Sequence, residues 1–285
     1  MIKTIQIIND AFNDYMPVVA FSGGKDSLVL LDIIYRFTHH KPTAIYVHND
    51  LLRAETLSYV KQVCIQLNAP LKIVYPKKTA YEQWRISGYP ILGNLASVKW
   101  MQKYSHLGVK INCNSCCRAL KIAPGRRATR ELGMNAQLTG IRSTDDQNRW
   151  YKLTGEGHVN YNKADKLYLI SPLAHWTDLM VRRYIRMYEL SEHPGDGQTG
   201  CSFCAGGWKF TGNSIYALRR TDPEAWRKHL LESGIWKPML VVKLKIPLNA
   251  VEKAVAQIGG IEKLLDTTPQ IFDYGQDVPI QGYQK

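Results

Sequence analysis

A short apolar run that ends in a glycine loop and continues as an apolar helix is the strongest constraint on how this chain folds. Val18 to Phe21 is followed by Ser22-Gly23-Gly24-Lys25-Asp26-Ser27, and Leu28 to Phe37 is apolar at helical spacing. Glycine adopts backbone conformations with positive φ, so the chain can turn sharply at Gly23-Gly24. The segment therefore predicts a buried strand, a tight loop and a helix, the repeating unit of parallel α/β sheets.

The same alternation of strands and helices continues beyond this segment. We predict further strands at 43–48, 71–75, 136–141 and 167–170. We predict helices at 1–16, 55–67, 121–132 and 176–188, the last with Thr177 as its N-cap. The predicted fold class is therefore α/β, a doubly wound, mostly parallel sheet with helices on both faces.

The domain organisation follows from length and from a change of pattern near the C-terminal end. The 285 residues are enough for one sizeable core with a small addition. We predict a main domain over 1–215 and an α+β extension over 216–285 that packs on it. Inside the extension, the patterns predict helices at 217–233 and 250–265 and a strand at 240–246.

The chain is strongly basic, and the excess is concentrated in one stretch. Lys and Arg number 37 against 24 Asp and Glu, for a formal charge of +13. No acidic residue lies between Gln83 and Arg130. The basic residues of this stretch are Arg85, Lys99, Lys103, Lys110, Arg118, Lys121, Arg126, Arg127 and Arg130. The charge indicates either a solvated face or a field that attracts an anionic substrate, a nucleotide or a nucleic acid, and charge alone does not choose.

Apolar patterning and cysteine usage point to a cytoplasmic protein without membrane contact. The chain has no apolar run of about 18 residues, which a membrane helix requires. Its first residues carry Asp10 and Asp14 and lack the apolar core of a signal peptide. The six cysteines are clustered, which in such a chain favours metal ligation or catalysis over disulfides.

The glycine loop has the chemistry of a phosphate cradle. The helix that follows it presents unpaired N–H groups and the positive end of its dipole to an anion. Lys25 adds a positive charge, and Ser22 and Ser27 add hydroxyl donors. Asp26 would suit a Mg²⁺ ion that bridges to phosphates. The alternative is an ordinary glycine turn, and the loop lacks the spacing of the Walker motif.

The cysteine pairs Cys116-Cys117 and Cys201-Ser202-Phe203-Cys204 supply four thiolates for one metal centre. Thiolates select zinc or iron–sulfur, and adjacent cysteines are strained as ligands of a tetrahedral zinc. An iron–sulfur site is therefore favoured, with zinc or unligated buried thiols as alternatives. Cys113, outside the four, could relay sulfur but is better explained by packing. Cys64, in an apolar helical stripe, is expected to fill the core.

Ser22 to Ser27, placed after a strand, resembles the PP-loop of the N-type ATP pyrophosphatases, which share the adenine nucleotide alpha-hydrolase-like fold. The spacing of the cysteine pairs resembles the 4Fe-4S signature of the adenylylsulfate and phosphoadenylylsulfate reductases. Gly140-Ile141-Arg142 and the stretch 171–181 are similar to further segments of that family, so the resemblance covers about residues 15–210.

Two departures separate this chain from the reductases. The chain has no cysteine after Cys204, whereas the reductases carry a catalytic cysteine near the C-terminus. The loop is intact, as in enzymes that split ATP. The pattern is most similar to the iron–sulfur ATP pyrophosphatase of DNA phosphorothioate modification, whose acidic position is matched by Asn49-Asp50.

This resemblance implies an activity, cofactors and partners. ATP with Mg²⁺ would bind the loop, an acceptor would be adenylated, and a cysteine desulfurase would supply sulfur. DNA is the favoured acceptor, and tRNA is the next. The oligomeric state is left open, with a homodimer as one alternative. The implied catalytic residues are Lys25, Asp26 and Asp50. The residues implied to bind the nucleotide are Ser22, Gly23, Gly24, Lys25, Asp26, Ser27, Gly140 and Arg142. The implied ligands of the 4Fe-4S cluster are Cys116, Cys117, Cys201 and Cys204. A sulfonucleotide reductase and a non-catalytic nucleic-acid-binding module remain as alternatives.

Overall fold

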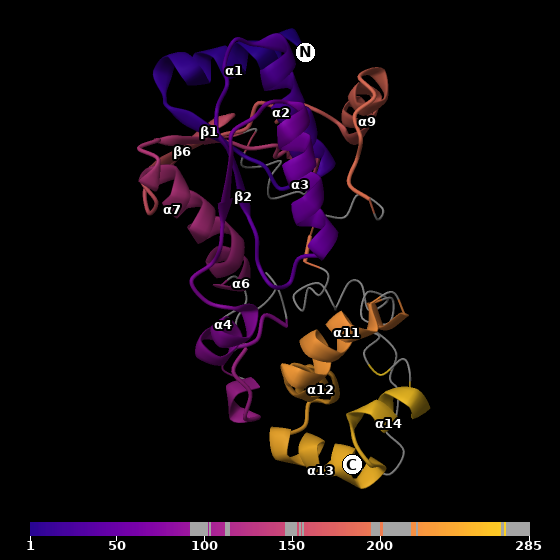
Figure 1. The fold of residues 1–285 in the computed structure, drawn as a ribbon. Coiled ribbons are helices and arrows are strands. Elements are labelled where there is room, and N and C mark those ends of the chain that lie inside the picture. The colour runs from indigo at the N-terminus through magenta and orange to yellow at the C-terminus, as the bar shows by residue number, and fades with distance from the viewer. Residues whose placement is uncertain are drawn as a thin grey trace. The chain divides into compact units, whose positions relative to one another are not determined.

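The computed structural model contains two compact units (Figure 1). The first unit comprises residues 1–77 and 120–200, and the second comprises 78–119 and 201–285. The structure describes residues 1–91, 102, 104–111, 115–145, 153, 155, 157–194, 200–201, 218–220, 222–268 and 271. Residues 78–119 group with the C-terminal residues, so this division does not follow the predicted boundary at 215. An extension that begins at residue 216 and packs on the main domain stays a prediction.

The first unit is built on a six-stranded sheet in the order β3-β2-β1-β4-β6-β5. Its strands are β1 Pro17–Ala20, β2 Ala44–Val47, β3 Leu71–Val74, β4 Ala136–Leu138, β5 Val159–Asn162 and β6 Leu167–Ile170. Five strands run parallel, and β5 pairs with β6 in antiparallel register. The sheet confirms the predicted mostly parallel fold class and adds an edge strand that the sequence patterns did not indicate.

Helices cover both faces of this sheet, as predicted. The α-helices described in the first unit are α1 Ile2–Asp14, α2 Lys25–Phe37, α3 Ala54–Gln66, α7 Ala123–Glu131 and α9 Asp178–Met187. A 3-10 turn lies at Ser143–Asp145, and a π-helical turn at Arg118–Ile122, whose first two residues belong to the second unit, leads into α7. Because neighbouring residues of a strand face opposite sides, Val18 packs with Ala128 of α7, whereas Val19 packs in the core of α1, α2, α3 and α9. Figure 1 shows α2 and α7 on opposite sides of β2.

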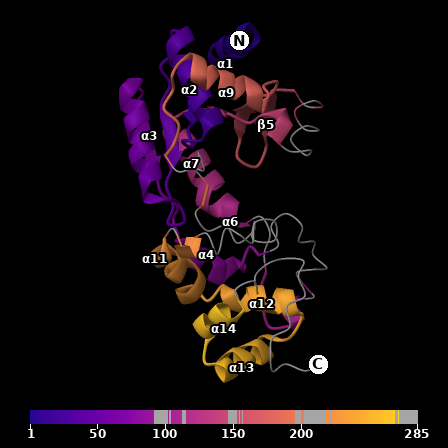
Figure 2. The same cartoon turned by 90° about the vertical axis from the view of Figure 1, so that its right-hand side faces the viewer.

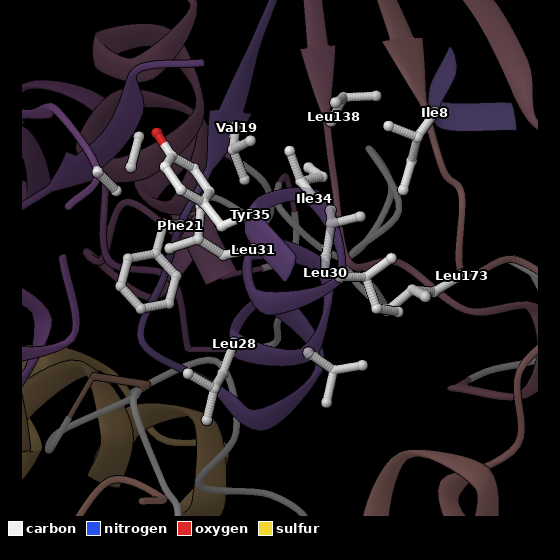
Figure 3. Packing of buried hydrophobic residues seen from close by; sticks show 14 of the residues in the cluster. Ile8, Val19, Phe21, Leu28, Leu30, Leu31, Ile34, Tyr35, Leu138 and Leu173 are labelled. Carbon is white, nitrogen blue, oxygen red and sulfur yellow. The ribbon is translucent and has the colours of Figure 1, made fainter. Parts of the chain in front are cut away.

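Helix α2 is the most deeply buried helix of the core and supports the loop that precedes it. Its residues Val29, Leu30, Leu31, Ile33 and Ile34 are fully buried. Figure 3 shows Leu30, Leu31 and Ile34 among side chains from β1, β4 and α1. Each such side chain stabilises the fold by about 1.5–3 kcal/mol relative to exposure. The loop at the N-terminus of α2 is therefore attached to a rigid element.

The second unit is helical over its described residues. Its elements are α4 Ala80–Ser87, α6 Ser115–Cys117, α11 Pro223–Trp226, the π-helical turn Arg227–Glu232, α12 Trp236–Leu244, α13 Leu248–Ile258 and α14 Ile261–Thr267 (Figure 2). The Tyr81 hydroxyl of α4 donates to the carbonyl of Lys228 at 2.8 Å, and Leu248 N donates to the Leu107 carbonyl at 2.9 Å. Such contacts explain why 78–119 joins the C-terminal residues.

Two predictions for the C-terminal region are corrected by the structure. The predicted strand at 240–246 is wrong, because residues 240–244 lie in α12. A short continuous apolar run fits a buried helix as well as a buried strand, and Leu240, Val241 and Val242 are all buried here. The predicted helix at 250–265 is interrupted at Gly259 and Gly260, whose φ values are +96° and +111°.

Among the described residues, no helix has the length and apolarity to cross a bilayer.

Candidate functional site

The predicted phosphate loop lies between β1 and α2 and turns through a left-handed glycine. Gly23 has φ +79°, and the extended residue Gly24 is the N-cap of α2. No side chain caps this helix end. The first N–H groups of α2 thus lack the partner that a capping side chain provides, and helix N-termini of this kind bind anions.

The two loop serines hold the turn in shape. Ser27 Oγ donates to the Gly24 carbonyl at 2.8 Å and accepts from Ser22 N at 3.3 Å. Ser22 Oγ lies 3.1 Å from Ser27 Oγ and accepts from Gly24 N at 3.3 Å. Ser27 is buried, whereas Ser22 is exposed. The exposed Ser22 is therefore the serine better placed to meet a ligand.

Gly140 packs directly against the backbone of the loop. A Cβ atom at this position would lie 2.8 Å from Asp26 C and 2.8 Å from Ser27 N. Real Cβ atoms do not approach backbone so closely, so only glycine fits unless the loop moves. The structure thus brings Gly140, which follows β4, together with the loop. Its contact is with the loop backbone, and contact with a nucleotide stays a prediction.

A network of ion pairs surrounds the start of α2. Lys25 Nζ lies 3.0 Å from Asp178 Oδ1 and 3.4 Å from Asp26 Oδ2. Arg142 Nε lies 3.1 Å from Asp26 Oδ1, and its Nη2 lies 2.8 Å from Asp145 Oδ1 and 3.5 Å from Asp178 Oδ1. The Arg142 side chain is only 7% exposed. Three carboxylates from distant parts of the chain therefore hold both predicted cations in place.

The electrostatics of this network leave unsatisfied groups at its centre. Burial raises the pKa of Asp26, against the opposite effect of Lys25 and Arg142. Asp26 Oδ1 and Arg142 Nε and Nη1 are buried and have no hydrogen-bond partner among the described residues, so the 3.1 Å contact between Oδ1 and Nε is a charge contact. Buried unpaired polar atoms are costly and require an explanation, and a bound ion or ligand is one such explanation. Asp26 Oδ1 fits a divalent cation and Arg142 fits an anion.

The end of β2 contributes a second group of polar residues. Asn49 is 2% exposed, its Oδ1 accepts from Leu51 N at 3.0 Å, and its Nδ2 finds no hydrogen-bond partner in the described part of the chain. Asp50 follows it and is half-buried. Burial lowers the pKa of His48, which stacks edge-on against Tyr75. Within the described residues, no three carboxylate, imidazole or thiol groups are gathered to hold a metal, so the shared metal role of Asp26 and Asp50 stays a prediction.

Two cavities open beside the loop at the carboxyl ends of the strands. The smaller, about 180 Å³, is lined by Ser22, Tyr46 and Lys121, among others. The larger, about 340 Å³, shares Lys121 with it and continues past Thr139 and Ser171. Ligands of open α/β sheets bind at this edge. Lys121 lines both cavities. From the sequence, this residue of the basic stretch could either neutralise nucleotide phosphates or cluster thiolates or lie on a solvated helix face, and the sequence alone did not choose.

The cysteine residues are described in part. Cys116 and Cys117 form α6, where Trp84 Nε1 donates to Cys116 Sγ at 3.3 Å and Cys117 is exposed. Such N–H···S contacts orient and tune thiolate ligands. Cys113 and Cys204 lie outside the described residues. The four-sulfur set is thus not contained in the described part of the chain, and the 4Fe-4S cluster stays a prediction.

The expectation for Cys64 is confirmed. Its side chain is 2% exposed within the core of the first unit. Burial raises the pKa of its thiol to about 11. A thiol in this setting is a packing residue.

Comparison with known proteins identifies a family over most of the first unit. Residues 16–194 match the family described as "Phosphoadenosine phosphosulfate reductase domain". The matched range contains the loop, Gly140, Arg142 and Asp178, and it ends before Cys201.

The curated relatives are sulfonucleotide reductases of bacteria. The chain is 28% identical over 178 residues to phosphoadenosine 5'-phosphosulfate reductase of Vibrio campbellii, covering 62% of this chain and 60% of that protein. It is 26% identical over 210 residues to adenosine 5'-phosphosulfate reductase 2 of Bacillus subtilis, covering 72% and 79%. The match to the Vibrio protein thus spans only 60% of that relative's length.

Solved structures show more distant likeness. Phosphoadenylyl-sulfate reductase of Candida auris is 20% identical, with 67% of this chain and 81% of that chain covered at a TM-score of 0.47. The U34-tRNA thiolase of Methanococcus maripaludis with its 4Fe-4S cluster is 17% identical, with 77% and 70% covered at a TM-score of 0.42. Both TM-scores are below 0.5, so neither likeness supports a conclusion about function.

Proposed function

This chain belongs to the phosphoadenosine phosphosulfate reductase domain family, and we propose that it is an ATP pyrophosphatase that adenylates an acceptor for sulfur transfer. The observation that carries the proposal is the intact loop at an uncapped helix N-terminus, with Lys25 beside it. A polyphosphate would receive backbone N–H groups, a helix dipole and an ammonium at one place.

In the proposed reaction, an acceptor oxygen attacks the α-phosphorus of ATP and the bond to the bridging oxygen of the β-phosphate breaks. Pyrophosphate leaves with the electron pair of that bond. Sulfur at the oxidation level of sulfide then attacks the atom that carries the adenylated oxygen, and AMP leaves with that oxygen and the electron pair. A thiol reductant would release sulfur at this level from the persulfide that a cysteine desulfurase forms. Lys25 and Arg142 would stabilise the charge that grows on the leaving pyrophosphate. Mg²⁺ would neutralise part of that charge, and the unsatisfied Oδ1 of Asp26 is the oxygen suited to face it.

DNA is the acceptor that we propose, with sulfur supplied by a cysteine desulfurase. Support comes from the net charge of +13 and from the stretch between Gln83 and Arg130 without acidic residues. The proposed cluster ligands Cys116, Cys117, Cys201 and Cys204 would place a 4Fe-4S cluster in the same enzyme. A tRNA acceptor would use the same chemistry.

The second candidate is reduction of adenylylsulfate or phosphoadenylylsulfate. The names of the curated relatives favour it. Against it stands the intact loop from Ser22 to Ser27, which is typical of enzymes that split ATP.

The deciding experiment is pyrophosphate release from ATP by anaerobically purified protein, with duplex DNA, tRNA or neither added. We expect release that depends on nucleic acid and falls at least about 100-fold in Lys25→Ala, since the loop loses its ammonium. Lys253→Ala, an exposed lysine of α13, is the matched control. Absence of release under all conditions, together with sulfite formation from adenylylsulfate and thioredoxin, would establish the reductase instead.

A further inference from the structure

Asp178 reaches the phosphate loop from a helix that is distant in sequence. It lies in the first turn of α9, where Thr177 Oγ1 caps the helix by accepting from Met180 N at 3.3 Å. Helix α9 is fixed to α2 by a buried hydrogen bond, in which the Tyr184 hydroxyl donates to Asp32 Oδ2 at 2.6 Å. The direction of Asp178 is therefore set by the packing of two helices.

Each carboxylate oxygen of Asp178 is engaged by a cation. Oδ1 lies 3.0 Å from Lys25 Nζ and 3.5 Å from Arg142 Nη2. Oδ2 accepts from Arg182 Nε at 2.6 Å. The hydrogen bonds from Arg182 and Lys25 lower the pKa of Asp178 to about 2, so the group is ionised at neutral pH. About half of its side chain is exposed.

Three carboxylates and three cations meet in the ion pairs that the described residues form around the loop. The carboxylates are Asp26, Asp145 and Asp178, and the cations that contact them are Lys25, Arg142 and Arg182. An incoming triphosphate must share Lys25 with a carboxylate that already lies within 3.0 Å of its ammonium. Like charges at such separations repel unless a counterion lies between them.

We propose that Asp178 is a positioning residue that acts through Lys25 and makes the loop select metal-bound over metal-free polyphosphate. Asp178 holds the flexible ammonium at the loop, which preorganises it. Its negative charge also opposes a bare triphosphate, whereas a triphosphate neutralised by Mg²⁺ meets less repulsion. The inference rests on the proposed function, because it concerns how that same site takes ATP.

The test compares equilibrium binding of ATP by the full chain with Mg²⁺ and with a chelator. In Asp178→Asn the amide oxygen can still accept from Lys25, but the charge is removed. We expect metal-free ATP to bind about tenfold tighter than to the wild type, Mg-ATP to change less than about twofold, and adenosine to stay unchanged. Glu252→Gln is the matched control, since this exposed carboxylate pairs with Lys237 at 2.6 Å in the second unit.

Arg182→Gln should change the affinity for metal-free ATP in the opposite direction. Loss of Arg182 leaves the charge of Asp178 less compensated, so metal-free ATP should bind several-fold more weakly. Unfolding cannot produce opposite signs in the two variants. An unchanged ratio of Mg-ATP to metal-free affinity in Asp178→Asn would overturn the inference. Failure of the wild type to bind either form of ATP would overturn the proposed function, and with it the selection.

Discussion

The phosphate loop of the first unit and the thiol of Cys116 in the second unit are held in different ways. Gly140 packs on the loop backbone at Asp26 and Ser27, the two loop serines bond across the turn, and most of α2 behind the loop is buried. The Cys116 thiol accepts a hydrogen bond from Trp84 Nε1 on the short helix α4. The comparison teaches that one chain can fix an anion site on a buried helix and sheet and orient a thiol through a neighbouring side chain.

The largest effect should come from Gly140→Ala, which tests the backbone contact at the loop. The added Cβ would lie 2.8 Å from Asp26 C, so the loop must shift. We expect ATP binding to fall at least about tenfold and the free energy of unfolding to fall by about 1–3 kcal/mol. Gly155→Ala is the control, because its Cβ meets nothing within 4 Å. Equal ATP affinity in the two variants would show that the contact of Gly140 with the loop does not affect ATP binding.

The next largest effect should come from the buried hydrogen bond that connects α9 to α2. Tyr184→Phe removes the hydroxyl that donates to Asp32, a carboxylate that is 0% exposed and also binds Arg36. We expect the free energy of unfolding to fall by about 1–3 kcal/mol in denaturant titration. Tyr161→Phe alters a tyrosine that is 47% exposed and should change stability far less. Similar losses in both would mean that the buried hydrogen bond does not fix α9.

A smaller effect should separate two tryptophans of the second unit. Trp84→Phe keeps an aromatic ring but removes the N–H that donates to Cys116 Sγ. We expect a loss of about 1 kcal/mol in the free energy of unfolding. Trp226→Phe is the matched variant, because Trp226 is also buried but its Nε1 has no hydrogen-bond partner among the residues that the structure describes, so this variant should lose less stability than Trp84→Phe. The reverse order of stabilities would contradict a role for the Trp84 hydrogen bond.

The smallest effect should appear in the acid dependence of stability. The pKa of Asp178 is lowered from 3.8 to about 2, mainly by Arg182 and then by Lys25. A lowered pKa in the folded state means that the contribution is present above pH 3.8 and is lost as the pH falls toward 2. Asp178→Asn should lack this component between pH 4 and pH 2 in unfolding titrations. Identical acid profiles for variant and wild type would show that the ion pairs of Asp178 add nothing to stability.

Most elements of the first unit could be predicted from the sequence, because periodicity reports burial directly. The run Val18 to Phe21 and the helix at 28–37 were confirmed as β1 and α2 with small shifts of boundary. The prediction failed at 240–246, where an apolar run without alternation contains no signal that separates helix from strand. Strand β5 was missed because four half-exposed residues at an edge give a weak pattern.

The site was predictable only where its residues adjoin in sequence or match a known motif. The loop from Ser22 to Ser27 was found in this way, and the structure places it at a helix N-terminus as expected. Asp178 lies in the stretch 171–181 that resembles the reductase family, but nothing in the sequence links it to Lys25. Cys204 and Cys113 lie outside the described residues, so the thiol site stays a prediction from the sequence.

The sequence by itself determined the strand–loop–helix unit, the glycines that allow the loop and the basic excess, because these depend on residues near one another in the chain. Only the tertiary structure decided which charges meet at the loop. Lys25, Arg142 and Asp178 are brought together by the order of β1, β4 and β6 in the sheet and by the packing of α9 on α2. Coulomb energy depends on distance in space, and distances between remote segments are set by the fold.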